Sequence, residues 1–348
     1  MFQISISNQP VVMSKFFAPA DKASVIAAIP EGTKRVVFID TPATSHLVAT
    51  IEELIAKGTE VVVRDHHDVP SPRNPREEDI AAAANRVREL VGSNATISNR
   101  QVNPACSGLI ETGEFNGEGT VIVADPDPDG LTAAMKALGS VYDGLDADAA
   151  VLDGARSEQT ADRLTPVAVL LVKGMATLPP FNPERPAVAE EAKGKLFAEF
   201  VSAASGDAAA LESLGRKVEA YEAGVRAAEA IAATATQPVA GVVMVNAVGK
   251  PRHDLATLTQ RLEANSGARV TVVRKDNGPI AGKHGGVQVS LAVVKAHQAE
   301  INLQDLLPSG FVSSPESGII SNTTFLLHVS ESVWNETVLP ALSAKLAV

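Results

Sequence analysis

The sequence predicts an α/β fold, with a mostly parallel sheet flanked by helices, then a helical linker and a smaller C-terminal α/β domain. Two observations predict this class. Short apolar runs typical of buried strands alternate with amphipathic segments of helical period through the first half of the chain. At 348 residues the chain is also long for a single core, and its character changes after about residue 177.

The first half repeats the pattern of strand, polar cluster and helix three times. The expected strands are 35–39, 59–63 and 120–124, and the expected helices are 45–57, 77–91 and 131–138, with the start of another helix at 106–112. In open parallel sheets, ligands gather at the carboxyl ends of the strands. The polar clusters that follow the strands are therefore expected to converge.

A proline-rich stretch and two alanine-rich and glutamate-rich helices separate the first half from a second strand-rich unit. The helices are expected at 187–204 and 207–233, and the later strands at 239–245, 269–274, 286–293 and 324–329. We therefore expect three regions, which are residues 1–176, a helical linker at 177–238, and a smaller α/β domain at 239–348.

Composition narrows the possible functions. A net charge of −11 argues against broad binding of long nucleic acid, which needs a basic surface, but it leaves room for a small anionic phosphate substrate held by metal ions. The apolar runs are too short to cross a bilayer, so we expect no membrane partner, and no signal peptide is evident. A single cysteine, Cys106, excludes an internal disulfide and fits a cytoplasmic location. The sequence leaves open whether the chain forms a homodimer.

Three carboxylates alternate with prolines directly after the strand at 120–124. In an extended segment Asp125, Asp127 and Asp129 would point to one face. Their mutual repulsion lowers stability unless a bound cation or a hydrogen-bond network offsets it. Such an oxygen-rich cluster suits divalent cations, although a calcium loop or a solvated turn would have the same composition.

A second cluster, Asp65-His66-His67, follows the strand at 59–63. Imidazole and carboxylate are good ligands for divalent transition metals, whereas the plainer interpretation is a solvated polar loop. Asp40 ends the strand at 35–39, and Asp153 follows a further apolar run. Each of these two aspartates, taken alone, is typical of a turn.

Together these residues resemble the DHH phosphoesterase superfamily. Asp65-His66-His67 is similar to its name motif, the run from Asp125 to Ala133 resembles the triple-aspartate motif of RecJ-like members, and Asp40 resembles the single-aspartate motif. The segment 102–110 is also similar to the one that follows the double histidine in this superfamily. The resemblance covers most of residues 35–175.

The resemblance implies two divalent metal ions, manganese first, with magnesium or cobalt as alternatives. Asp40 would bridge the ions, His66 and Asp153 would complete the shells with Asp125 and Asp127, and Asp129 would be a ligand or an outer-shell acceptor. By the same resemblance the catalytic residues are His67, which would touch the scissile phosphate, and Asp65, which would orient a histidine. Water activated by the two ions would attack phosphorus.

The order of the motifs differs from that of the superfamily, in which the Asp-x-Asp motif usually comes first. Here it follows Asp40 and Asp65-His66-His67. A circular permutation explains this order, because metal binding depends only on convergence at the sheet edge. The alternative is that Asp125-Asp129 fills the last motif position and the first motif is lost, which would leave one metal site incomplete.

Residues 239–348 resemble the DHH-associated C-terminal domain more faintly. Where that domain has a glycine-rich loop with a histidine, the stretch 307–318 has serines and no histidine. The candidate substrate-binding residues there are Ser313 and Ser314, and a second candidate loop contains Lys283, His284 and Gly285. Either loop has a plainer interpretation as an ordinary turn.

These observations predict a metal-dependent phosphodiesterase, a hydrolase acting on short single-stranded oligonucleotides or dinucleotides. One alternative is a pyrophosphatase or small-phosphate hydrolase with the same metal centre. Another is a non-catalytic nucleotide-binding protein that retains the fold, since a fold alone does not determine a function.

Overall fold

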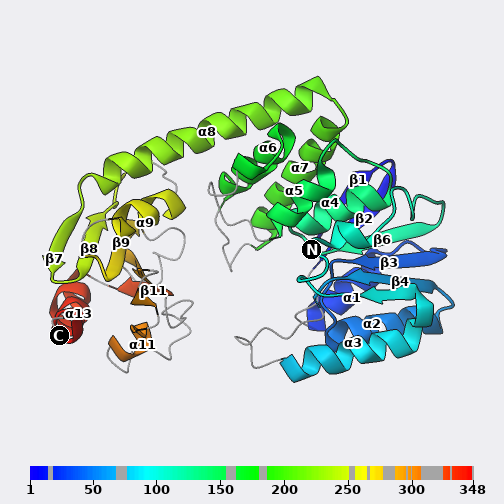
Figure 1. Cartoon of the computed structure of the whole chain (residues 1–348), viewed down its shortest axis with the longest axis horizontal. Coiled ribbons are helices and arrows are strands. Elements are labelled where there is room, and N and C mark those ends of the chain that lie inside the picture. The colour runs from blue at the N-terminus through cyan, green and yellow to red at the C-terminus, as the bar shows by residue number, and fades with distance from the viewer. Residues whose placement is uncertain are drawn as a thin grey trace. The chain divides into compact units, whose positions relative to one another are not determined.

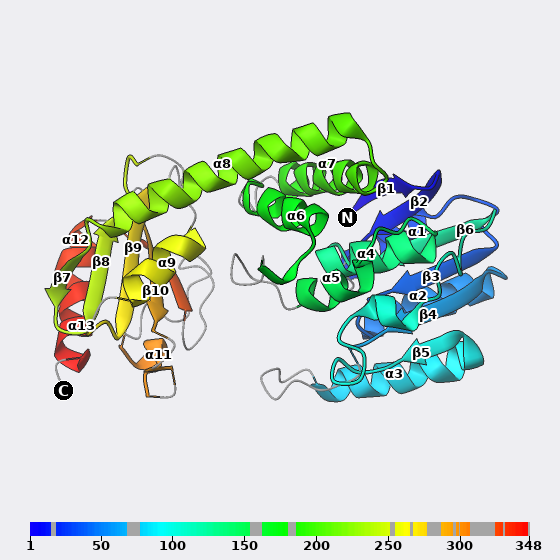
Figure 2. The ribbon, with the colours of Figure 1, turned by 45° about the horizontal axis from the view of Figure 1, so that its top comes forward.

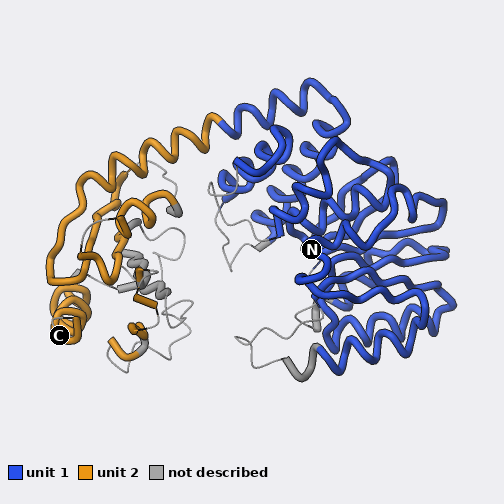
Figure 3. Tube along the Cα trace, viewed as in Figure 1, with its two compact units in different colours: residues 1–218 blue, residues 219–348 orange. Residues whose placement is uncertain are grey.

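The computed structural model describes residues 1–14, 19–67, 77–153, 162–179, 186–250, 255–264, 267–276, 287–294, 297–298, 300–306, 324–329 and 331–346. These residues form two compact units, Met1–Val218 and Glu219–Val348, and the division falls within one long helix, α8 (Ala208–Ala232) (Figure 3). Each unit has its own sheet. None of the described helices is long and apolar enough to cross a membrane.

The first unit is built on a six-stranded sheet in the order β1-β2-β6-β3-β4-β5 (Figures 1 and 2). The strands are β1 (Phe2–Ile6), β2 (Gln9–Met13), β3 (Arg35–Ile39), β4 (Glu60–Asp65), β5 (Ala95–Ile97) and β6 (Thr120–Ala124). Every pair of neighbours is parallel except the hairpin of β1 and β2. The prediction of a mostly parallel sheet is therefore confirmed.

The two central strands are apolar after their first residues, Arg35 and Thr120. β6 is buried at all five positions, and β3 is buried at every position except Arg35. A strand covered on both faces has no solvent side on which polar residues would alternate. The Val-Ile-rich runs at 35–39 and 120–124 therefore mark the middle of the sheet.

Helices cover both faces of this sheet. On one face α1 (Pro19–Ala28), α2 (Ser45–Ala56) and α3 (Glu77–Val91) pack over residues such as Val36 and Phe38. The other face is covered by α4 (Pro128–Ala137), α5 (Leu145–Leu152), α6 (Pro166–Ala176) and α7 (Pro186–Ala204). Alternate residues of one strand thus enter two separate cores, as the two-residue period of a strand requires.

The second unit contains a five-stranded sheet in the order β11-β10-β9-β8-β7, in which only β8 and β9 are parallel. The strands are β7 (Thr236–Val239), β8 (Val242–Asn246), β9 (Val270–Asp276), β10 (Val287–Val293) and β11 (Thr324–Val329). Besides the end of α8, the helical segments among its described residues are α9 (Leu255–Glu263), α11 (Leu303–Leu306), α12 (Glu331–Val333), the π-helical turn η6 (Trp334–Val338) and α13 (Leu339–Leu346).

Three expectations need correction. The segment 106–112 forms only a short 3-10 turn, η2 (Cys106–Leu109), because the chain is already extended at Ile110. The single strand expected at 239–245 is two antiparallel strands, since Gly241, at φ +77°, turns the chain between them. The aspartate stretch is not extended throughout, because α4 begins at Pro128, with Asp127 as its N-cap.

Gly130 lies where the first turn of α4 meets the end of β6. A Cβ atom at this position would lie 2.3 Å from the backbone carbonyl oxygen of Asp125, and backbone cannot move aside cheaply. We predict that Gly130→Ala lowers the free energy of unfolding by about 1–3 kcal/mol. Denaturant titration of the purified variant measures this difference.

Gly215→Ala is the matched control, since Gly215 lies inside α8 and a Cβ atom there meets no atom within 4 Å. In an open helix interior this change should raise stability by up to about 1 kcal/mol. Equal stability of Gly130→Ala and the wild type would show that the close approach of Gly130 and Asp125 is not required.

Candidate metal centre

Three neighbouring strands, β4, β3 and β6, end at the same level of the sheet, and a polar cluster lies at the end of each. In the parallel register Ile39 of β3 lies opposite Arg64 of β4 on one side and opposite Ala124 of β6 on the other. The residue that follows each of these three positions is an aspartate: Asp65 ends β4, and Asp40 and Asp125 come directly after β3 and β6. The expected convergence of the clusters at the carboxyl edge is a consequence of this register.

Asp40 leaves β3 in an uncommon backbone conformation. Its φ is +55°, in the left-handed region that aspartate tolerates better than most residues. The Asp40 N–H donates to the carbonyl of Arg64 at 2.9 Å, so the backbone stays attached to β4 while the side chain turns inward. Asp40 is only 1% exposed. Strained residues of this kind are typical of functional sites.

The ring orientation of His66 is fixed from behind. Its Nδ1 lies 3.0 Å from the carbonyl oxygen of Asn103, which only accepts, so Nδ1 carries a hydrogen. In the neutral ring Nε2 then holds a lone pair. That atom lies 3.0 Å from Oδ1 of Asp40 and 3.4 Å from Oδ2 of Asp129. A lone pair thus faces two carboxylates.

These three side chains are almost completely removed from solvent, and none is more than 1% exposed. Within the described residues, Oδ1 of Asp40, Nε2 of His66 and Oδ1 of Asp129 are buried without a hydrogen-bond partner. Burial raises the pKa of Asp40, and the negative charge of Asp129 raises it further. Burial likewise raises the pKa of Asp129 and lowers that of His66, so the ring favours its neutral form.

A divalent cation fits this arrangement. Buried, unsatisfied acceptors cost free energy, and one cation would satisfy imidazole and carboxylate together. Three groups of side chains could each hold an ion, because within each group the candidate ligand atoms lie within 4.8 Å of one another. The groups are Asp40, His66 and His67; His66, Asp129 and Asp153; and Asp40, Asp125 and Asp127. The donor types suit transition metals such as Mn²⁺. Because Asp40 and His66 each belong to two groups, ions bound by neighbouring groups would have a ligand residue in common.

The three aspartates of the Asp-Pro-Asp-Pro-Asp stretch face this point from different backbone positions. Asp125 follows β6 directly, Asp127 caps α4 by accepting from the Gly130 N–H at 2.8 Å, and Asp129 lies in the first helical turn. Asp129 belongs to the group with His66, whereas Asp125 and Asp127 belong to the group with Asp40. Lys193 of α7 donates to the carbonyl of Pro126 and so supports the same loop.

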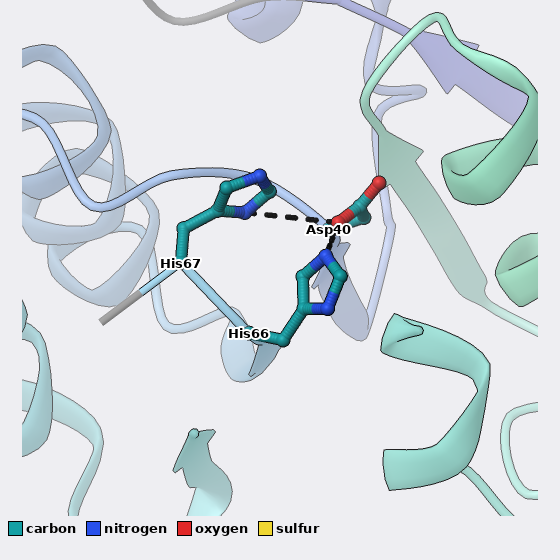
Figure 4. A group of neighbouring side chains, drawn as sticks. All are labelled: Asp40, His66 and His67. Atoms are coloured by element: carbon teal, nitrogen blue, oxygen red, sulfur yellow. Dashed lines mark ion pairs between the residues drawn. The ribbon is translucent and has the colours of Figure 1, made fainter. Parts of the chain in front are cut away.

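Asp65 lies behind His67. Its Oδ1 is 2.7 Å from Nδ1 of His67, so the carboxylate fixes the tautomer in which Nδ1 carries the hydrogen. Figure 4 shows both imidazole rings directed at Asp40, with Nδ1 of His67 3.7 Å from Oδ1 of that residue. His67 remains 19% exposed at its side chain, whereas His66 is closed off.

The structure thus brings together seven of the sequence candidates, with Asp65 behind them. These seven are Asp40, His66, His67, Asp125, Asp127, Asp129 and Asp153. The candidates Lys283, His284, Gly285, Ser313 and Ser314 lie outside the described residues. Sequence reasoning gave no role to two neighbours of the site, Asn103 and Arg100. Asn103 lies in the stretch 102–110, which resembles a superfamily segment, whereas Arg100 precedes that stretch and has no motif that distinguishes it from an ordinary loop residue.

The raised pKa values of Asp40 and Asp129 predict how stability depends on pH without metal. Between the ordinary carboxyl pKa and the raised value, the folded chain holds protons that the unfolded chain has released. The free energy of unfolding therefore falls as pH rises through this range. With a chelator, Tm should be lower at about pH 8 than at about pH 5. Added Mn²⁺ should raise Tm most at the higher pH, because ligand carboxylates must be ionised.

Thermal unfolding followed by circular dichroism measures both effects. Asp129→Asn, which removes a buried carboxylate, should flatten the pH dependence and reduce the response to Mn²⁺. Asp143→Asn removes an exposed aspartate and should change neither. A Tm that is independent of pH and of Mn²⁺ would contradict the assignment of a metal centre.

No protein-family model matches the chain, and no curated protein matches it significantly. Solved structures do match. One is the pGpG-specific phosphodiesterase PggH from Vibrio cholerae, at 10% identity and a TM-score of 0.38, over 90% of this chain and 98% of that chain. Another is the DHH domain of a member of the s1p family of ribosomal proteins, at 14% identity and a TM-score of 0.38, over 94% of this chain and 75% of that chain.

Proposed function

We propose that this chain is a divalent-metal-dependent phosphodiesterase of the DHH type that hydrolyses short single-stranded oligonucleotides or dinucleotides. One observation supports this most strongly. The buried Nε2 of His66 faces the carboxylates of Asp40 and Asp129, and no hydrogen bond within the described residues satisfies it. Such a constellation is costly unless a cation binds, and clustered carboxylate and imidazole ligands are typical of phosphoryl hydrolysis.

From the three overlapping ligand groups we infer two sets of metal ligands, with His67 left for the substrate. His66, Asp129 and Asp153 would hold one ion, and Asp125 and Asp127 would hold the other, with Asp40 between them. Manganese fits the mixed set of nitrogen and oxygen donors. When bound, two such ions supply an activated water for attack on phosphorus and stabilise the charge that develops on the phosphate.

The side chains of the protein supply orientation. Asp65 holds His67 with Nε2 turned away from it, toward the half-open side of the site where a substrate phosphate would lie. Cys106 is the only thiol of the chain, and it is unsuited as a nucleophile. It is fully buried, burial raises the pKa of its thiol, and the Cys106 S–H donates to the carbonyl of Arg64. Water is therefore the proposed nucleophile.

The acidic character of the chain favours short substrates. With a net charge of −11, phosphates far from the metal centre would gain little from the protein surface. The position of β6 beside β3 supports the proposal of a permuted motif order, because Asp125 meets Asp40 despite following it in the chain. Under the alternative of a lost motif, one of the two ligand sets would be incomplete.

The activity test uses purified protein with Mn²⁺ and three substrates: a 5′-phosphorylated diadenylate, a long single-stranded DNA, and inorganic pyrophosphate. We predict release of adenosine monophosphate from the dinucleotide, with much slower cleavage of the long strand. Asp40→Asn should lower kcat/KM by about a thousandfold, because Asp40 belongs to the ligand group of Asp125 and Asp127 and its carboxylate also lies 3.0 Å from Nε2 of His66 in the other set. Chromatography of the products measures these rates.

Asp143→Asn, the exposed control, should retain wild-type rates. Phosphate release from pyrophosphate without dinucleotide cleavage would replace the proposed activity by that of a pyrophosphatase. Nucleotide binding without hydrolysis of any substrate, in protein loaded with metal, would indicate a non-catalytic binding protein.

A further inference from the structure

Arg100 contacts the metal centre from its open side. Its Nη2 lies 2.7 Å from Nε2 of His67 and 2.8 Å from Oδ1 of Asp153. Its side chain is 50% exposed, whereas that of Asp153 is 11% exposed. One side of the guanidinium therefore faces candidate ligands, and the other faces solvent.

A structured turn holds Arg100 in this place. The side-chain Oδ1 of Asn99 accepts from the N–H groups of Gln101 and Val102, and Asn99 forms a β-bridge with His67. At the end of the same turn the carbonyl of Asn103 fixes the ring of His66. The turn that orients one histidine of the pair thus also carries the arginine that contacts the other.

The hydrogen bonds at His67 are consistent with Arg100 as a donor. Because Nδ1 of His67 donates to Asp65, Nε2 holds a lone pair that accepts an N–H of Arg100. A guanidinium has five N–H donors in a planar fork, and these two contacts use only Nη2. The remaining donors on the exposed side match the paired oxygens of a phosphate group.

We propose that Arg100 binds the non-bridging oxygens of the substrate phosphate beside His67. This inference rests on the proposed function. The metal centre gathers the carboxylates of Asp40, Asp125, Asp127, Asp129 and Asp153, so an approaching anion needs positive charge in addition to bound cations.

Asp153 links this role to the ligand groups. Its carboxylate contacts Arg100 and also belongs to the group with His66 and Asp129. If Asp153 served as a metal ligand, its ion pair with Arg100 would weaken and the guanidinium would be available to the phosphate. Arg100 is then a binding residue for the anion, not a support for the metal ligands.

Isothermal titration with inorganic phosphate and with adenosine monophosphate, in the presence of Mn²⁺, tests this proposal. Arg100→Gln should weaken the affinity for both by about tenfold to a hundredfold, the loss expected for a hydrogen bond between charged groups. The number of Mn²⁺ ions bound and Tm should not change. Arg100→Lys, which keeps the charge but loses the fork, should have an intermediate affinity.

Arg86→Gln is the matched control, because Arg86 is 47% exposed and pairs with Glu52 and Glu89 on the surface of the helices. It should bind both anions like the wild type. In the dinucleotide assay Arg100→Gln should raise KM more than it lowers kcat. Unchanged anion affinity in Arg100→Gln, or lost Mn²⁺ binding, would overturn the role of Arg100. If the wild type hydrolyses no substrate, the proposed phosphodiesterase fails, and the titration still decides whether Arg100 binds phosphate.

Discussion

The contact between Asp40 and His66 is the constraint on which the site depends. Parallel pairing brings the ends of β3 and β4 side by side, and burial removes the water that would otherwise solvate a carboxylate and an imidazole 3.0 Å apart. The carbonyl of Asn103 fixes the proton on the far nitrogen, so both facing atoms are acceptors when Asp40 is ionised. This repulsion is tolerable in a folded protein when a cation lies close by. The neighbouring loops and helix α4 place further carboxylates, those of Asp125, Asp127, Asp129 and Asp153, around this contact.

The scaffold supplies those carboxylates with little freedom of movement. β6 lies against β3, so the Asp-Pro-Asp-Pro-Asp stretch begins at the level of Asp40. α4 starts within the stretch, which sends Asp129 into the core while Asp127 stays at the helix N-terminus. Gly130 permits the close return of the chain to Asp125, and Lys193 holds the loop from α7. Asp65 and the turn 98–103 orient the two histidines and place Arg100 at the open side.

The residues that were predictable from the sequence carry their signal locally. The runs 36–39 and 121–124 are uninterrupted and apolar, so they indicate central strands. Asp65-His66-His67 is a weak signal alone and becomes informative beside Asp40 and the Asp125–Asp129 stretch. The hairpin of β1 and β2 was missed because its turn, at Ser7 and Asn8, lacks the glycine that usually marks one, although both residues have positive φ. The position of Asp129 was misjudged because a proline within an aspartate-rich stretch suggests extended chain as readily as the first turn of a helix. The role of Arg100 depends on a contact across 33 positions of sequence, for which no local pattern exists.

The central claim is that this edge of the sheet binds divalent cations between the two ligand sets. Anomalous scattering at the manganese edge, from crystals grown with Mn²⁺, locates such ions directly. We expect two ions per chain, one among His66, Asp129 and Asp153 and one among Asp125 and Asp127, with Asp40 beside both. A chain that binds no manganese at these residues, or only a single ion, would contradict this account.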